Sequence, residues 1–147
     1  DTLFARLGGT GIGDEGWYGY LPYSVNHDVK VLARYLAPYG FRVSASLEWL
    51  SGYHWEKKGL SPAYGFYLTF PEERGGRTTL AHAYFDLAIA KEFTLRKGLV
   101  LDLGVNVYNL FNSQTPTSYA KEDTDLFGQV WGRQLPRWAQ IRAGVRF

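Results

Sequence analysis

The sequence lacks cysteine and methionine, and it contains no long hydrophobic run. Without cysteine, disulfide frameworks and thiolate metal sites are excluded. Without an apolar stretch of about 18 residues, a transmembrane helix is excluded, but a β-barrel is not, because barrel strands give only weak, alternating signals. Since translation starts at methionine, we expect the chain to be processed or to be a piece of a longer protein. The absence of a visible signal peptide therefore has no meaning.

The sequence also has no large excess of positive or negative charge. The net charge is +2 at pH 7, which gives no support for nucleic acid as a partner. Aromatic residues, in contrast, are abundant and make up 17% of the chain.

The length of the chain, 147 residues, is enough for one domain.

The C-terminal segment 137–147 is the most informative part of the sequence, because its apolar and polar residues alternate strictly. Ile141, Val145 and the final Phe147 share one parity, and Gln140 and Arg142 share the other. A period of two is the signature of a β-strand. The same pattern recurs upstream, so we expect five strands, at residues 28–37, 41–50, 82–95, 99–110 and 137–147.

The two parities of these strands differ in charge. Apart from Arg137, the first residue of the last predicted strand, Lys91 is the only charged residue of the apolar parity, whereas ten charged residues share the other parity. Lys91 lies near a strand end, where a lysine side chain can extend to a polar interface. A sheet with one apolar face needs either a second apolar layer or lipid against that face. The sequence contains no second apolar layer and no convincing helical pattern.

The connections between the predicted strands alternate in length. The turns at 38–40 and 96–98 are short, whereas 51–81 and 111–136 are long, and residues 1–27 are expected to form a further loop. Short turns at one end and long loops at the other are typical of outer-membrane barrels, and soluble domains rarely need such long structureless loops. We therefore predict an all-β fold, an antiparallel transmembrane β-barrel wall of about five strands belonging to a larger barrel, with long extracellular loops.

Four stretches resemble TonB-dependent outer-membrane receptors, with features of their Oar-like branch. The final strand ends in an aromatic residue, Phe147, and Val105–Asn112 is similar to their penultimate strand. Residues 21–53 resemble one of their late hairpins, and Leu135–Arg137 fits the approach to their last strand. The resemblance implies that 1–147 is the C-terminal segment of a plugged barrel of the 22-stranded type.

The resemblance also implies a function and a set of partners. The function would be energy-coupled uptake of a bulky ligand through the outer membrane of a bacterial cell, without enzymatic activity and without a cofactor. The partners would be the remainder of the barrel and its plug domain, a TonB-type energy-coupling protein, outer-membrane lipid and the transported ligand, which is unknown. Phe147 would be the signal for the barrel-assembly machinery. Five strands cannot close a barrel, so the wall needs further strands.

Two groups of residues are expected to form sites. The plug-facing lumen residues would be Arg42, Glu48, Asp86, Glu92, Asp102, Arg142 and Arg146. Three of these, Asp86, Glu92 and Asp102, could also be catalytic carboxylates, but we favour a polar network against the plug. The ligand-binding residues of the external loops would be His54, Trp55, Tyr64, Tyr67, Glu72, Asp123, Asp125 and Trp131. The alternative for each is an interface anchor or a solvated loop residue. The three histidines lie far apart in the sequence, so we expect no metal site.

Other functions stay open at this point. The chain could be a structural or scaffolding partial barrel in a multi-chain outer-membrane assembly that transports nothing. It could also be a soluble β-sandwich that acts as a binding module, although such a module should not carry one face almost free of charge. An enzyme is the least supported class, because no catalytic arrangement of serine, histidine and aspartate stands out.

Overall fold

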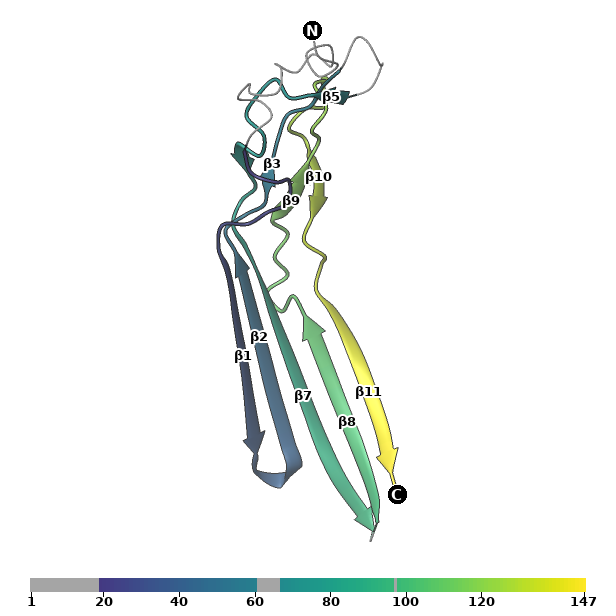
Figure 1. The fold of residues 1–147 in the computed structure, drawn as a ribbon. Helices are drawn as coiled ribbons and strands as arrows, with labels where there is room; N and C mark the ends of the chain where they lie inside the picture. The colour runs from purple at the N-terminus through teal and green to yellow at the C-terminus, as the bar shows by residue number, and fades with distance from the viewer. Residues whose placement is uncertain (1–18, 61–66, 97) are drawn as a thin grey trace. The chain divides into compact units, whose positions relative to one another are not determined.

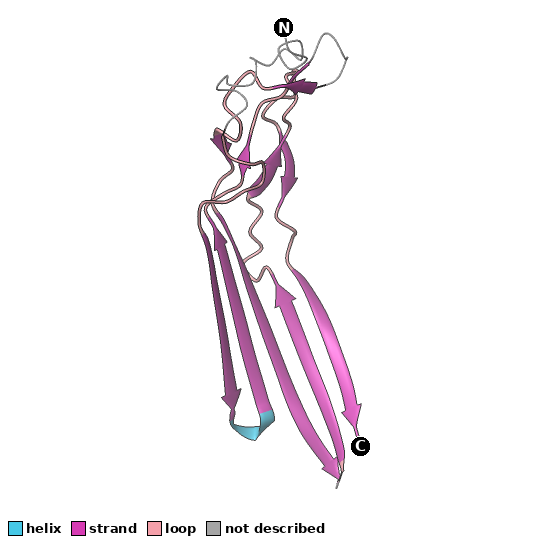
Figure 2. Cartoon of the chain, in the orientation of Figure 1, coloured by secondary structure: helices cyan, strands magenta, loops and turns pink. Residues whose placement is uncertain are grey.

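The computed structural model describes residues 19–60, 67–96 and 98–147, and these are built from β-strands joined by turns and loops (Figures 1 and 2). The chain divides into two compact units. The sheet unit contains residues 28–49, 82–114 and 135–147, and the loop unit contains residues 1–27, 50–81 and 115–134. Most of the loop expected at 1–27 lies outside the described residues. No described segment forms a helix that is long and apolar enough to cross a membrane.

The sheet unit is a single five-stranded sheet, in which neighbouring strands run in opposite directions (Figure 1). Its order is β1 (Asp28–Ala37), β2 (Phe41–Leu50), β7 (His82–Arg96), β8 (Leu99–Tyr108) and β11 (Trp138–Arg146). The five strands predicted from alternation are confirmed. The ends differ slightly, because β7 extends to Arg96, β8 stops at Tyr108 and β11 covers only Trp138–Arg146.

Strand pairing confirms the predicted division into two faces. Ile89 on β7 pairs with Val105 on β8, and Val105 pairs in turn with Ile141 on β11. Directly paired residues point to the same face of a sheet, so these apolar side chains form one row across three strands. Glu92 pairs with Asp102 in the same way on the opposite face. The faces described below as apolar and polar are defined by these two rows.

The turns and the C-terminal residue of the sheet unit lie at the same end of the sheet (Figure 1). The β1–β2 turn is the short 3₁₀ segment η3, Pro38–Gly40. Gly40 has a φ of 79° and Tyr39 a φ of 63°. Proline and glycine commonly shape such a turn, whereas a left-handed tyrosine is unusual, because a bulky residue rarely adopts that conformation.

Asn109 anchors the end of β8. Its side-chain amide donates hydrogen bonds to the carbonyls of Ser113 (2.8 Å) and Leu135 (2.7 Å), and its Oδ1 accepts one from the Ser113 N–H (2.9 Å). Its backbone N–H donates to Asp86 Oδ1 on β7 (3.0 Å). Asn109 is only 5% exposed. One buried side chain therefore holds the end of β8 against the segment that leads into β11.

Asn112 repeats this role three residues later. Its Oδ1 accepts a hydrogen bond from the backbone N–H of Arg137 at 2.9 Å. Asn109 and Asn112 have φ values of 50° and 54°, which asparagine tolerates better than most residues. The Asn-Leu-Phe-Asn stretch that contributes to the family resemblance thus has a local structural purpose, which is to turn the chain after β8 and to fix the start of β11.

The described residues of the loop unit form six short strands, although the sequence predicted long loops without any. They form three antiparallel pairs: β3 (His54–Trp55) with β6 (Arg77–Thr78), β4 (Gly59–Leu60) with β5 (Tyr67–Thr69), and β9 (Pro116–Tyr119) with β10 (Val130–Arg133). Strands of two to four residues are too short to show an alternating pattern in the sequence. They satisfy backbone groups that a long loop would otherwise leave without partners.

Backbone hydrogen bonds also join the two long connections to each other. The Lys58 N–H donates to the carbonyl of Lys121 at 2.8 Å, and the Asp123 N–H donates to the carbonyl of Lys58 at 2.9 Å. The segment before β1 joins them, because the Tyr23 N–H donates to the His54 carbonyl at 2.8 Å and the His54 N–H donates to Ser24. Three distant stretches of sequence therefore fold together as one unit.

Candidate functional site

The apolar face of the sheet unit carries large side chains that are exposed. Ile141 is 82% exposed, Val145 62%, Val105 43% and Ile89 43%. Water-exposed aliphatic side chains are common singly, but a continuous apolar patch over several strands marks a surface that contacts another protein or a membrane. Lys91, the charged residue of this face, lies with Nζ 4.4 Å from the centroid of the Phe41 ring, so its charge rests against an aromatic ring at the turn end of the sheet.

The polar face is organised around Arg42 on β2. Its guanidinium donates to Glu92 Oε1 on β7 (2.5 Å) and to Asp102 on β8. Arg142 on β11 reaches Asp102 from the other side, with 3.8 Å between Nη2 and Oδ1. The structure thus brings together four of the seven predicted lumen residues in one network that crosses four strands.

Gly104 makes room for this network. A Cβ added to Gly104 would lie 3.3 Å from the Ala90 Cβ and 3.4 Å from Arg142 Nη2. The Arg142 side chain can therefore cross β8 close to the backbone on its way to Asp102. Gly144 on β11 differs, because the nearest atom to an added Cβ would be the Asp102 Cβ at 4.0 Å.

The other predicted lumen residues lie outside this network. Glu48 pairs with Lys30 (Oε1 to Nζ, 3.0 Å), and Lys30 also pairs with Asp28 at 3.1 Å. Asp86 accepts the hydrogen bond from the Asn109 backbone N–H described above. Arg146 lies near the end of β11 and is exposed, with no charged partner among the described residues.

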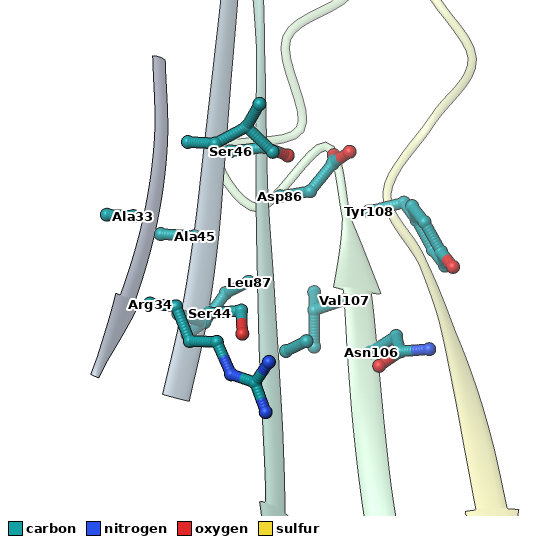
Figure 3. A pocket seen from close by; sticks show the side chains of 12 residues that line it. Ala33, Arg34, Ser44, Ala45, Ser46, Asp86, Leu87, Asn106, Val107 and Tyr108 are labelled. Atoms are coloured by element: carbon teal, nitrogen blue, oxygen red, sulfur yellow. The ribbon is translucent and has the colours of Figure 1, made fainter. Parts of the chain in front are cut away.

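A hollow of about 430 Å³ lies in the sheet unit and is lined by residues of β1, β2, β7 and β8 (Figure 3). Arg34, Ser44, Ser46, Asp86 and Tyr108 contribute the polar groups around it. A carboxylate and a guanidinium thus border the same space, together with the hydroxyl groups of Ser44 and Ser46. Asp86 is engaged by a backbone N–H. The arrangement suits the binding of polar groups better than acid–base chemistry.

Trp55 is the centre of a cluster in the loop unit. It is 8% exposed, stacks on Tyr119 with ring centroids 5.1 Å apart, and packs against Phe127 at 5.8 Å. The Arg77 guanidinium lies 5.5 Å from the Trp55 ring centroid and 5.0 Å from that of Phe127. Lys57 Nζ lies 4.9 Å from the Phe127 ring. We call these five residues the Trp55 cluster; it fixes β3, β6 and the 119–127 stretch to one another.

Two ion pairs border the Trp55 cluster. Arg77 donates two hydrogen bonds to Glu72, from Nε to Oε2 at 2.7 Å and from Nη2 to Oε1 at 2.8 Å. These bonds hold the pKa of the Glu72 carboxyl below its ordinary value and raise the pKa of Arg77. Lys57 Nζ pairs with Asp123 Oδ1 at 2.8 Å. Glu72 and Asp123, both predicted to contact ligand, are thus engaged with cations of the loop unit itself.

His54 is also turned into the loop unit. It is 4% exposed, and its ring stacks on Tyr20 with centroids 4.0 Å apart. Nδ1 lies 2.6 Å from the carbonyl oxygen of Gly75, which can only accept, so Nδ1 carries the hydrogen. Nε2 lies 3.1 Å from Asn26 Oδ1. Since its ring is buried against Tyr20 and its Nδ1 is bound to the Gly75 carbonyl, His54 has a packing role, and its predicted contact with a ligand stays a prediction.

The remaining predicted ligand residues have different positions. Asp125 is exposed, and Trp131 on β10 is 80% exposed. Tyr64 lies outside the described residues. Tyr67 begins β5, but its side chain is outside the description. Among the described members of the predicted group, Asp125 and Trp131 are accessible, and so is Asp123, whose side chain is 50% exposed although it pairs with Lys57.

Trp131 borders a second hollow, of about 520 Å³, in the loop unit. Tyr23, Lys121, Glu122 and Leu126 line it together with Trp131. Lys121 Nζ lies 4.1 Å from the centroid of the Tyr23 ring, so a cation and an aromatic ring meet at its wall. Sequence analysis missed Tyr23 here, because it lies almost a hundred residues from the others and nothing local marks the contact.

Glu56 is the most deeply buried acidic residue described. It is 1% exposed, and neither carboxylate oxygen has a hydrogen-bond partner among the described residues. An unpaired buried charge is costly, so we expect a carboxylate at this position to destabilise the loop unit. Nothing in the sequence pattern singled out this residue.

Neither a search for metal-binding groups nor comparison with known proteins identifies a further functional site. In the part of the chain that is described, no group of three or more histidine, aspartate or glutamate side chains could hold a metal ion. Comparison with protein families, with curated proteins and with solved structures found no match.

Proposed function

We propose that this chain forms part of the wall of an outer-membrane receptor, with lipid against its apolar face and external loops that capture a ligand. The receptor would take up a bulky ligand through a plugged barrel, driven by a TonB-type energy-coupling protein. The exposed apolar face of the sheet unit is the observation that carries this proposal. The family resemblance of the sequence supplies the transport function and the partners.

The exposed row of Ile89, Val105 and Ile141 supports contact with lipid. These side chains lie mid-strand on three neighbouring strands, and the opposite face holds the ion pairs of Arg42 and Lys30. Transmembrane barrels have this arrangement, with an apolar outer surface and a polar interior. In water the same row would be a large apolar patch and an aggregation risk.

The open edges of the sheet support a larger barrel. β1 and β11 are the outermost strands, and nearly all of their residues are exposed. Unpaired strand edges are not tolerated in lipid, because no water is present to satisfy their N–H and C=O groups. Further strands from another segment or chain would have to pair with both edges.

The loop unit supports ligand capture by a preformed surface. Its Trp55 cluster and its short strands hold the long connections in place, and the hollow beside Trp131 offers aromatic and charged groups to a ligand. Ligand sites are often built in this way, from apolar walls with a few polar groups. In this mechanism the ligand binds to the loop unit, and it passes into the barrel after the plug is rearranged.

A pair of substitutions on β11 tests contact with lipid. Ile141→Arg places a charge on the apolar face, and Gln140→Arg places the same charge on the polar face next to it. At mid-membrane an arginine facing lipid costs about 2–4 kcal/mol, whereas at a water-exposed position a substitution stays within about 0.5 kcal/mol. We expect Ile141→Arg, but not Gln140→Arg, to reduce the amount of protein in the outer-membrane fraction. Equal membrane levels for both variants would contradict the proposal.

A structural role without transport is the second candidate, and the two open edges favour it as much as they favour a receptor. Here the chain would be one wall segment of a multi-chain assembly. The intact mass of the native polypeptide separates the two. A mass several times 16.7 kDa supports a receptor with its own plug, and a mass near 16.7 kDa supports the multi-chain assembly.

A further inference from the structure

Charge pairing on the polar face of the sheet unit is uneven. Each of its acidic residues has a partner in the chain: Asp28 and Glu48 pair with Lys30, Glu92 and Asp102 pair with Arg42, and Asp86 accepts the Asn109 N–H. Each carboxylate on this face therefore has a partner in the chain, although the Asp102 Oδ1 atom has no hydrogen-bond partner among the described residues. The same is not true of its cations.

Three arginines on this face are left with little or no negative charge. Arg34 and Arg146 have no ion pair among the described residues, and Arg142 lies 3.8 Å from an Asp102 carboxylate that already binds Arg42. Arg142 has a side chain that is 57% exposed, and Arg34 is exposed as well. The face carries five cations and five carboxylates, and four of the carboxylates gather on Lys30 and Arg42, so within the described part of the chain positive charge is left unpaired at Arg34 and Arg146 and only weakly paired at Arg142.

Two of these arginines border one hollow, of about 350 Å³, together with Arg42. We call it the arginine hollow. Ser44, Ala88 and Ala90 are the small residues of its lining, and Asp102 and Asn106 complete it. In the view of Figure 3 the Arg34 side chain extends away from β1 and towards β7. Small side chains leave space for an incoming group between the guanidinium groups of β1, β2 and β11.

We infer that the arginine hollow binds acidic side chains of a protein segment that packs against the polar face; this inference rests on the proposed barrel wall. Arginine pairs with carboxylates through two parallel hydrogen bonds and is more weakly hydrated than lysine, so it suits ion pairs that become buried. A segment that packs here without acidic residues would bury Arg34 unpaired and leave Arg142 with only its 3.8 Å contact to Asp102, which is unfavourable. The partner segment therefore carries Asp or Glu where it meets β1 and β11.

Zero-length cross-linking tests this inference in the native membrane. Arg34→Lys and Arg142→Lys keep the positive charge and supply an amine, which a carbodiimide joins to a carboxylate in direct contact. We expect mass spectrometry to find links from these lysines to Asp or Glu outside the sheet unit. Lys30, which lies 3.0 Å from Glu48, is the positive control, and Lys91 on the apolar face is the negative control.

The outcomes separate this inference from the proposed function. Links from position 34 or 142 only to Asp102 or Glu92, or no links while the Lys30–Glu48 link forms, would overturn it. Capture of an anionic small molecule in place of a protein carboxylate would also leave no protein link, and it would overturn the inference too. Outer-membrane fractionation of the same samples tests the barrel wall independently, so each idea can fail while the other stands.

Discussion

The two units of the chain use their aromatic and aliphatic side chains in opposite ways. In the loop unit, Trp55 is 8% exposed and packs between aromatic rings and cations of the same unit. In the sheet unit, Ile141 is 82% and Phe147 100% exposed. The difference indicates that the loop unit has an apolar centre of its own, whereas the described residues leave the apolar face of the sheet uncovered.

Removal of the Trp55 side chain should have the largest effect of the substitutions considered, because it should destabilise the loop unit and leave the sheet unit unchanged. Trp55→Ala deletes the stacked ring and leaves Arg77 without its aromatic support, so we expect a loss of about 3–5 kcal/mol within the loop unit. Native-state hydrogen exchange should show faster exchange at 54–58 and 119–129, while β7 and β8 stay protected. Trp131→Ala is the matched control, because Trp131 is 80% exposed, and it should change stability by less than about 0.5 kcal/mol. A larger effect at Trp131 would contradict the assigned centre of the unit.

Asn109→Ala should cause the next largest loss of stability, and this loss should occur in the sheet unit. The variant loses three side-chain hydrogen bonds and leaves buried backbone groups without partners, at a cost of about 2–4 kcal/mol. Exchange should accelerate at the ends of β8 and β11. Asn106→Ala removes only a 3.5 Å contact to Gln140 and should be nearly neutral. Similar losses for both asparagines would show that the anchoring role of Asn109 is wrong.

Glu56→Gln should act in the opposite direction and stabilise the loop unit. The substitution keeps the shape of the side chain and removes a buried charge that lacks a partner, so the expected gain is about 1–3 kcal/mol. The exposed Glu73 serves as a control, since Glu73→Gln should change little. A loss of stability in Glu56→Gln, measured by urea titration of tryptophan fluorescence, would indicate that the charge is needed.

The Glu72–Arg77 pair should have the smallest effect, which is a dependence of the stability of the loop unit on pH. The pKa of Glu72 is lowered in the folded chain by hydrogen bonds from Arg77, so its contribution is fully present above the ordinary value of 4.5 and disappears as pH falls through the lower folded value. Glu72 is 37% exposed, so solvent weakens the effect. Hydrogen exchange at β6 should increase below about pH 4.5 in the native chain, and Glu72→Gln should remove this extra dependence on pH. An unchanged profile in the variant would exclude Glu72 as its source.

The sheet could be predicted from the sequence because its signal is local and repeated. Alternation over nine or more residues fixed both the position of each strand and the face of each side chain, including the polar row of Glu92 and Asp102. The shapes of the turns followed partly from Pro38 and Gly40. The left-handed Tyr39 could not be foreseen, because no residue preference indicates it.

The loop unit could not be predicted, because its contacts join distant residues with no periodic pattern. Trp55 meets Tyr119, and Tyr23 meets Lys121, across long stretches of sequence. Composition indicated that the loops were rich in aromatic and charged residues, but it could not indicate which of these pair with each other. For this reason His54 and Glu72 were expected to contact ligand, whereas in the structure they are engaged within the unit.

The number of strands in the sheet also limits how it can be completed. Five strands with alternating directions leave β1 and β11 running the same way. Copies of this chain placed side by side in one orientation would therefore bring two edges together in parallel. Any partner that closes the ring with antiparallel pairing throughout must contribute an odd number of strands.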